Sequence, residues 1–161
     1  MERDYQLLYN KYKNKYLKLK ENTLQLGGAK KLKSTQPTQT SDSSMSSQFY
    51  SEHLSEPWFT LISMGLKTVE GRKNKGRFKE MKIGDIVEWN NDDFKHRSVK
   101  TRIIGKNNYK TFEEYLNTEG LQKCLPGMPS IEHGLSVYFK YFTKEDEAQF
   151  GVTAIQLELI K

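Results

Sequence analysis

The sequence predicts an α+β domain with a curved or barrel-like sheet, preceded by an N-terminal arm. Two observations carry this prediction. Apolar or β-branched residues alternate with polar ones, as in strands, in four segments of the 161-residue chain: 67–73, 85–90, 98–105 and 152–160. Helix start signals and helical apolar spacing occur between them, and strands interleaved with helices over this length indicate one small mixed domain.

Residues 1–21 are predicted to form a basic amphipathic helix. Lysines surround an apolar stripe with helical spacing, which consists of Tyr5, Leu8, Tyr9, Tyr12, Tyr16 and Leu19. Such a helix could dock on the domain, self-associate, lie on a membrane surface or bind nucleic acid. It could equally be detached from the fold, because a helix this short is weakly stable alone. Self-association or tethering is therefore one expected role of this segment.

Residues 22–49 are predicted to be a disordered linker. Ser, Thr and Gln dominate this segment and large apolar residues are few. Such a composition cannot bury enough apolar surface to offset the entropy cost of ordering the chain. The folded domain is therefore expected at residues 50–161.

The first half of this domain is predicted to begin with a helix. Ser55 is a candidate N-cap, Glu56 and Pro57 suit a first helical turn, and Gly65 is a stop signal. After it we expect a strand, a basic loop, a strand, a hairpin-like connection and a second strand, at 67–73, 75–82, 85–90, 90–93 and 98–105.

The second half is predicted to be mostly helical before the last strand. Thr111 with Glu114 three residues later forms a capping-box pattern. Ser130 is the expected N-cap of a further helix, in which Tyr138 and Tyr141 are read as packing residues. The helical segments are 111–116, 121–125, 130–142 and 143–149, and the strand is 152–160.

Several classes of protein are not favoured by the sequence. No apolar run of about 18 residues predicts a transmembrane helix, and the N-terminus lacks a signal-peptide core. The single cysteine, Cys124, is read as a buried or half-buried thiol rather than a nucleophile, and the three histidines show no metal-binding spacing. No cofactor or metal is expected. Phosphate-binding glycine loops are also absent from the sequence.

The polar segment at 65–82 is the candidate functional site. The net charge of +6 resides in the first 34 residues, which hold nine basic and three acidic residues, so the rest of the chain is neutral. Yet residues 67–82 alone hold seven basic and two acidic residues. Such a local patch is sufficient for phosphate contacts, although it could equally be a solvated charged loop.

Strand alternation arranges the side chains of this segment. In an extended run, Thr68, Glu70 and Arg72 point to one face, and Lys67 and Val69 to the other. Glu70 and Arg72 could then form an ion pair, and an arginine held by a carboxylate can grip a phosphate or a base edge. A buried lysine beside Glu70 could alternatively perform acid–base or nucleophilic chemistry.

The pattern Gly65-x-Lys67-x-x-Glu70-x-Arg72 resembles the GxKxxExR signature of the ASCH domain family in the PUA-like superfamily. The similarity extends over about residues 50–161. It includes the segments Glu56-Pro57-Trp58-Phe59, Lys82-Ile83-Gly84-Asp85-Ile86 and Leu125-Pro126-Gly127. The resemblance implies a small β-barrel with flanking helices and a cleft.

The resemblance also implies binding of RNA or a modified nucleoside in the cleft of this domain. The expected ligand-binding residues are Trp58, Lys67, Thr68, Glu70, Arg72, Lys73 and Lys75. As an alternative, one bacterial branch of the family hydrolyses acylated cytidine through a Lys, a Thr and a Glu, and other members are ribonucleases. In such an enzyme Lys67 and Glu70 would be catalytic. Glu70 stands where that branch has Thr, and Glu119 is the nearest candidate for its Glu.

A second resemblance concerns the arm. Residues 9–20 followed by Gly27-Gly28 are similar to leader segments on many proteins of giant DNA viruses. This similarity implies a processing site at Gly28-Ala29 and a packaging role for the arm. The expected location is intracellular, in the cytoplasm, or in a host cell or virion if the protein is viral.

Overall fold

The computed structural model describes residues 47–93 and 95–160. The chain divides into two units, Met1–Ser47 and Gln48–Lys161, and the second contains the described fold. The helix predicted at 1–21, the processing site at Gly28-Ala29 and most of the linker predicted at 22–49 therefore lie outside the described residues.

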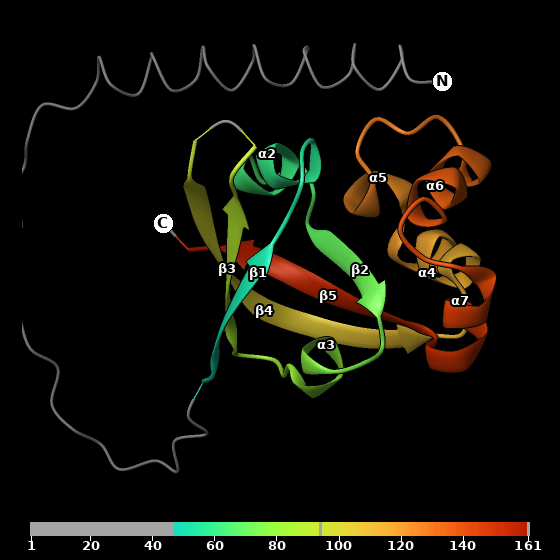
Figure 1. Cartoon of the computed structure of the whole chain (residues 1–161), viewed down its shortest axis with the longest axis horizontal. Coiled ribbons are helices and arrows are strands. Elements are labelled where there is room, and N and C mark those ends of the chain that lie inside the picture. The colour runs from blue at the N-terminus through green and yellow to red at the C-terminus, as the bar shows by residue number, and fades with distance from the viewer. Residues whose placement is uncertain (1–46, 94, 161) are drawn as a thin grey trace, which may run out of the picture. The chain divides into compact units, whose positions relative to one another are not determined.

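A curled sheet of five strands forms the centre of the second unit (Figure 1). The strands are β1 (Phe49–His53), β2 (Val69–Lys73), β3 (Ile86–Asn91), β4 (Arg97–Tyr109) and β5 (Val152–Leu159). Their order across the sheet is β1-β3-β4-β5-β2, with β1 parallel to β3 and all other neighbours antiparallel. The sheet forms a half-barrel, which confirms the predicted α+β, barrel-like fold.

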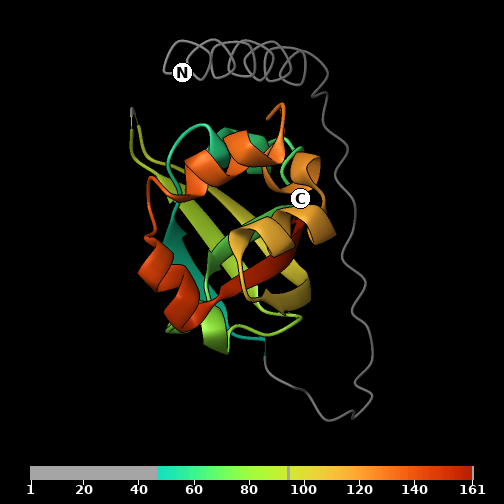
Figure 2. The ribbon, with the colours of Figure 1, turned by 90° about the vertical axis from the view of Figure 1, so that its right-hand side faces the viewer.

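Helices flank this sheet. They are α2 (Trp58–Ser63), α3 (Arg77–Glu80), α4 (Phe112–Glu119), α5 (Leu121–Cys124), α6 (Ile131–Tyr138) and α7 (Lys144–Phe150). Figures 1 and 2 show α4 to α7 grouped on the side of the sheet where β2 lies. Helix α3 occupies a segment predicted to be a basic loop. Its C-terminal turn is stabilised by Lys106, whose Nζ donates to the carbonyls of Phe78, Lys79 and Met81 at 2.7–2.8 Å.

The predicted helix caps are present in part. The hydroxyl oxygens of Thr111 and Ser130 accept from Glu114 N and His133 N, as expected. The predicted Ser55 cap is wrong, because α2 begins at Trp58. Its N-cap residue is Pro57, which makes no side-chain capping hydrogen bond. Instead the carboxylate of Glu56 accepts from Thr60 N at 3.3 Å and so satisfies a donor of the first turn.

The sheet, α2 and α4 all contribute side chains to the core. Its largest fully buried side chains include Trp89, Ile103, Phe112, Tyr115, Leu116 and Ile155. Burying one such side chain stabilises the fold by about 2 kcal/mol. The alternation predicted for β4 is confirmed, since Thr101 and Ile103 are buried whereas Lys100 and Arg102 are exposed. These contacts fix the sheet that carries the candidate site.

Strand β1 was not predicted, and it completes the half-barrel. It begins at Phe49, the last residue of the predicted linker, and pairs with β3 from Phe49↔Ile86 to His53↔Asn90. β1 and β2 are the two edges of the sheet. Arg72 bridges these edges, because its Nη2 donates to the His53 carbonyl at 3.4 Å. Arg77 of α3, the helix that follows β2, also reaches β1, with its Nε 3.1 Å from Glu52 Oε1. We call the region between these two edges the seam.

Candidate functional site

A cleft of about 330 Å³ opens at the seam. One wall comes from the end of β1 and the start of α2, and the floor comes from β2. The opposite wall comes from Leu125 just after α5, from α6 and from the residues after α6. The lining residues are His53, Leu54, Ser55, Trp58, Lys67, Glu70, Gly71, Arg72, Leu125, Val137, Tyr138, Tyr141 and Phe142. Four residues of the predicted site, Trp58, Lys67, Glu70 and Arg72, therefore lie together.

Lys67 is buried at the inner end of this cleft, with 2% of its surface exposed. Its Nζ lies 3.0 Å from Glu70 Oε2 and donates to the Val69 carbonyl at 2.8 Å and to the Cys124 carbonyl. The prediction that Lys67 points away from Glu70 is wrong. β2 begins only at Val69, so strand alternation does not apply to Lys67.

Glu70 connects Lys67 to Arg72. Its Oε1 accepts from Arg72 Nε at 2.7 Å, which confirms the predicted ion pair on one face of the strand. Burial alone would raise the pKa of Glu70, but the charges of Lys67 and Arg72 and their hydrogen bonds outweigh it and hold the pKa below its usual value. Glu70 is therefore an ionised carboxylate between two cations.

Arg72 is the outer cation of this group and lines the cleft. Its guanidinium carbon lies 5.1 Å from the centre of the Phe78 ring and 5.9 Å from that of Trp89. Within residues 47–93 and 95–160, its hydrogen bonds go to Glu70 and to the His53 carbonyl. A guanidinium has five N–H donors, so further donors on Nη1 and Nη2 stay available, and the side chain is 24% exposed.

Aromatic residues form much of the remaining lining. Trp58 is buried near Lys67, whose Nζ lies 5.7 Å from the centre of the indole ring. Tyr138 is buried and donates to the Tyr115 hydroxyl at 3.2 Å. Tyr141 was predicted to be a packing residue, but it is 61% exposed and lines the cleft. Tyr141 follows the C-terminal end of α6, beyond the last turn that packs into the core.

The other predicted ligand-binding residues lie outside the cleft lining. Thr68 is held by its backbone, which donates to the Lys123 carbonyl and accepts from Leu157 N. Lys73 pairs with Asp146 at 3.0 Å and lies 5.6 Å from the ring of Phe142. Lys75 is exposed, 4.5 Å from the ring of Phe150. The two lysines thus stand beyond the cleft, on the side where Phe142 lines it.

Glu119 is not part of the cleft. Its carboxylate accepts from Asn107 Nδ2 and Tyr109 Oη, both at 2.7 Å, and from Gln156 Nε2 at 3.0 Å. These contacts tie the end of α4 to β4 and β5. Glu119, the nearest candidate for the glutamate of the hydrolase branch, thus lies among groups of the sheet rather than among those that line the cleft.

Cys124 is buried, as predicted. Burial raises the pKa of its thiol to about 11, so the thiol is protonated at neutral pH. Among the residues that the structure describes, no group of three or more His, Cys, Asp or Glu side chains is arranged to hold a metal ion. None of the described helices is long and apolar enough to cross a membrane.

A helix-flanked half-barrel with a charged cleft at its open seam is typical of the PUA-like class of small barrels. The family model of the ASCH domain matches residues 53–161. The chain therefore belongs to the ASCH domain family, as the motif from Gly65 to Arg72 indicated. No curated protein matches the sequence.

Two solved structures share this fold. The crystal structure of the hypothetical protein PH0355 has 34% sequence identity and a TM-score of 0.64, and the match covers 70% of this chain and 100% of that one. The solution NMR structure of protein PF0455 from Pyrococcus furiosus has 32% identity and a TM-score of 0.59, and the match covers 71% and 99% of the two chains. These similarities support the fold. The inference of a ligand rests instead on the side chains that line the cleft.

Proposed function

We propose that this domain binds RNA or a modified nucleoside by taking one base into the cleft at the seam. The observation that carries the proposal is Arg72, which Glu70 holds in place and which lines a cleft together with several aromatic side chains. Oriented arginine donors suit the acceptor atoms of a base edge or a phosphate. Aromatic side chains next to them suit stacking on a planar base.

The size and polarity of the cleft support a single base as the ligand. A volume of about 330 Å³ is near the lower end of the range for small-molecule pockets. A nucleic-acid helix could not enter a cleft of this size, whereas one unstacked base with its sugar fits. Trp58, Tyr138, Tyr141 and Phe142 supply the apolar surface, and Arg72 supplies the polar contact.

The contacts of Lys67 favour binding over hydrolysis. An ammonium group has three N–H donors, and Lys67 has three acceptors in Glu70, Val69 and Cys124. These three acceptors engage Nζ from three directions, so the lysine nitrogen is not free to approach a substrate atom as a nucleophile or base must. Glu70 has a lowered pKa, and so it is a poor general base at neutral pH. The hydrolase alternative, with Lys67 and Glu70 as catalytic residues, consequently has less support.

Lys73 and Lys75 are proposed to contact the backbone of an RNA strand whose base occupies the cleft. Lys73 is partly neutralised by Asp146, so Lys75 would contribute more of this electrostatic attraction. Phosphate contacts release counterions, and they make affinity depend on salt. A free nucleoside, which has no phosphate, would show little of this dependence.

The experiment is a titration of the protein with ribonucleosides, N4-acetylcytidine and short single-stranded RNAs. Arg72→Gln is expected to weaken binding by about 10- to 100-fold, because a hydrogen bond to a charged group contributes about 1.5–3 kcal/mol. The matched control is Arg102→Gln, since Arg102 is an exposed arginine on β4. Equal binding by the two variants, or no binding by wild type to any ligand of the panel, would overturn the proposal.

The same titration tests the alternatives. Replacing Lys73 and Lys75 with Gln is expected to reduce the salt dependence of RNA binding and to leave nucleoside affinity unchanged. Hydrolysis products that form with wild type but not with Lys67→Met, in a variant that remains folded, would instead favour the hydrolase.

A further inference from the structure

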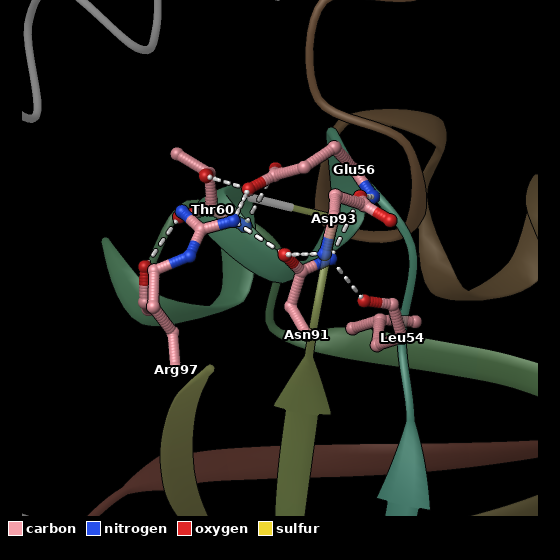
Figure 3. Close-up of polar contacts among 7 residues, drawn as sticks. Leu54, Glu56, Thr60, Asn91, Asp93 and Arg97 are labelled. Carbon is pink, nitrogen blue, oxygen red and sulfur yellow. Dashed lines mark hydrogen bonds and ion pairs between the residues drawn. The ribbon is translucent and has the colours of Figure 1, made fainter. Parts of the chain in front are cut away.

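The residues that form the β1 side of the cleft are held in place from outside it. Leu54, Ser55 and Trp58 line the cleft. Figure 3 shows the neighbouring polar groups converging on this segment from the end of β3 and the start of β4. These groups do not line the cleft. They therefore contact its wall from behind and would not contact a bound ligand.

Glu56 is the centre of this network. Its Oε1 accepts from Thr60 Oγ1 at 2.8 Å and from Arg97 Nη2 at 2.6 Å. Its backbone N–H donates to Asp93 Oδ2 at 3.2 Å. Because Glu56 lies between Ser55 and Trp58 in the chain, each of these contacts restrains the backbone that carries the cleft wall.

Asn91 restrains the same wall at Leu54, which precedes Glu56 in the chain. Its Nδ2 donates to the Leu54 carbonyl at 3.0 Å, and its Oδ1 accepts from Arg97 Nη2. Arg97 therefore joins Asn91 to Glu56 through one nitrogen. Its guanidinium carbon also lies 4.9 Å from the centre of the Phe59 ring in α2. A partly buried charged group with these contacts fixes one geometry rather than a range of them.

We infer that Arg97 is a positioning residue for the ligand cleft: through Glu56 and Asn91 it holds the wall formed by Leu54, Ser55 and Trp58. Leu54 touches both the cleft and the network, and Glu56 of the network lies in the chain between the cleft residues Ser55 and Trp58. The ligand-binding part of this inference rests on the proposed function, whereas the positioning of Trp58 does not.

The test exploits the two tryptophans of the chain. Trp58 lines the cleft, whereas Trp89 is fully buried and donates from Nε1 to Thr101 Oγ1. Labelling with 5-fluorotryptophan gives one fluorine NMR signal for each, and Trp58→Phe assigns them. Arg97→Gln is compared with Lys100→Gln, which removes the 3.7 Å pair of Lys100 with Glu88 on the same two strands.

We expect Arg97→Gln to shift or broaden the Trp58 signal, to leave the Trp89 signal in place, and to weaken binding of the nucleoside or RNA about tenfold. Lys100→Gln should match wild type in all three respects. If Arg97→Gln does not fold, Asp93→Ala tests the same network, because Asp93 is exposed and its carboxylate accepts from Glu56 N and from Asn91 Nδ2.

A folded Arg97→Gln protein with an unchanged Trp58 signal would overturn the inference. So would a simultaneous shift of both tryptophan signals, which would indicate general destabilisation. The fluorine measurement needs no ligand. If wild type binds nothing in the panel, the proposed function fails, and the Trp58 signal still decides whether Arg97 positions the wall.

Discussion

The guanidinium Nε of Arg72 lies 2.7 Å from Oε1 of Glu70, and this contact holds Arg72 in the lining of the cleft with its outer nitrogens not used by Glu70. Glu70 can hold Arg72 in this way because Lys67 balances its other oxygen at 3.0 Å. The three residues form a chain in which burial increases from Arg72 inward to Lys67. Only the outermost member offers donors to a ligand, and the two inner members fix its direction.

Arg72→Lys is predicted to bind no better than Arg72→Gln, to within about threefold. A lysine at this position has a single nitrogen, which cannot contact Glu70, the His53 carbonyl and a ligand in the geometry of a planar guanidinium. The measurement is the dissociation constant of the best ligand of the panel for both variants. Recovery of wild-type affinity by Arg72→Lys would show that charge alone matters at this position.

Glu70→Gln is predicted to destabilise the domain by about 3 kcal/mol at neutral pH. The substitution leaves the buried ammonium of Lys67 without its counter-ion, and breaking a buried ion pair costs about that amount. The measurement is urea unfolding of wild type and variant, with Glu88→Gln as a control at a more exposed ion pair. A difference below about 1 kcal/mol would contradict the structure of this pair.

The effect of Glu70→Gln is also predicted to depend on pH. The folded pKa of Glu70 lies below the ordinary value of 4.5, so its carboxylate stabilises the folded state above that pH. This stabilisation is lost as the pH falls through the folded pKa. The difference in unfolding free energy between wild type and Glu70→Gln should therefore be constant above about pH 5 and shrink below it. A difference that grows on acidification would show that folding does not lower the pKa of Glu70.

Local patterns in the sequence predicted the part of the site that lies on one strand. The pairing of Glu70 with Arg72 follows from their spacing of two residues in an extended segment. The same rule misplaced Lys67, because nothing local shows that β2 starts two residues later. The boundary depends on tertiary pairing, since Val69 is the first residue of β2 to pair with β5.

The parts of the fold that depend on distant contacts were not predictable in this way. β1 is a short mixed segment beside a polar stretch, and it becomes a strand by parallel pairing with β3, which begins 37 residues later at Ile86. The donor in the first turn of α2 is satisfied by Glu56 rather than by Ser55, and the carboxylate of Glu56 is also held by Arg97 from another strand. Tyr141 reaches the cleft only because α6 packs beside α4.

Cys124 is predicted to react with thiol reagents only after the domain unfolds. Its pKa of about 11 and its burial leave almost no accessible thiolate near pH 8. Because the chain has one cysteine, the extent of labelling by a chromogenic disulfide reports this site alone. Labelling should be slow in buffer and fast in denaturant. Rapid stoichiometric labelling of the native protein would contradict the burial of Cys124.

The raised pKa of the Cys124 thiol also predicts that the domain loses stability at high pH. A thiol whose folded pKa is raised above the ordinary value of 9.0 favours the unfolded state once the unfolded thiol ionises. Stability should therefore fall between about pH 9 and pH 11 and be insensitive to this group below pH 9. Cys124→Ala lacks the group, so the alkaline loss in that variant should be smaller than in wild type.

Gly71→Ala is predicted to destabilise the domain by about 1–3 kcal/mol and to disturb the cleft. A Cβ atom at Gly71 would lie 2.7 Å from two ring carbons of Tyr115, a rigid aromatic ring that is fully buried in α4. Displacing that ring would also displace Tyr138, whose hydroxyl meets the Tyr115 hydroxyl at 3.2 Å and whose side chain lines the cleft. Thermal unfolding and ligand titration of one preparation measure both effects.

Gly134→Ala is the matched control for this prediction. A Cβ atom there would meet the ends of leucine side chains, with Leu116 Cδ1 nearest at 2.9 Å. Leucine methyl groups can shift, and alanine is favoured over glycine inside a helix by about 1 kcal/mol, which offsets the crowding in α6. Gly134→Ala should therefore retain stability and ligand affinity close to wild type. Equal losses in the two variants would show that crowding by Tyr115 is not what requires glycine at position 71.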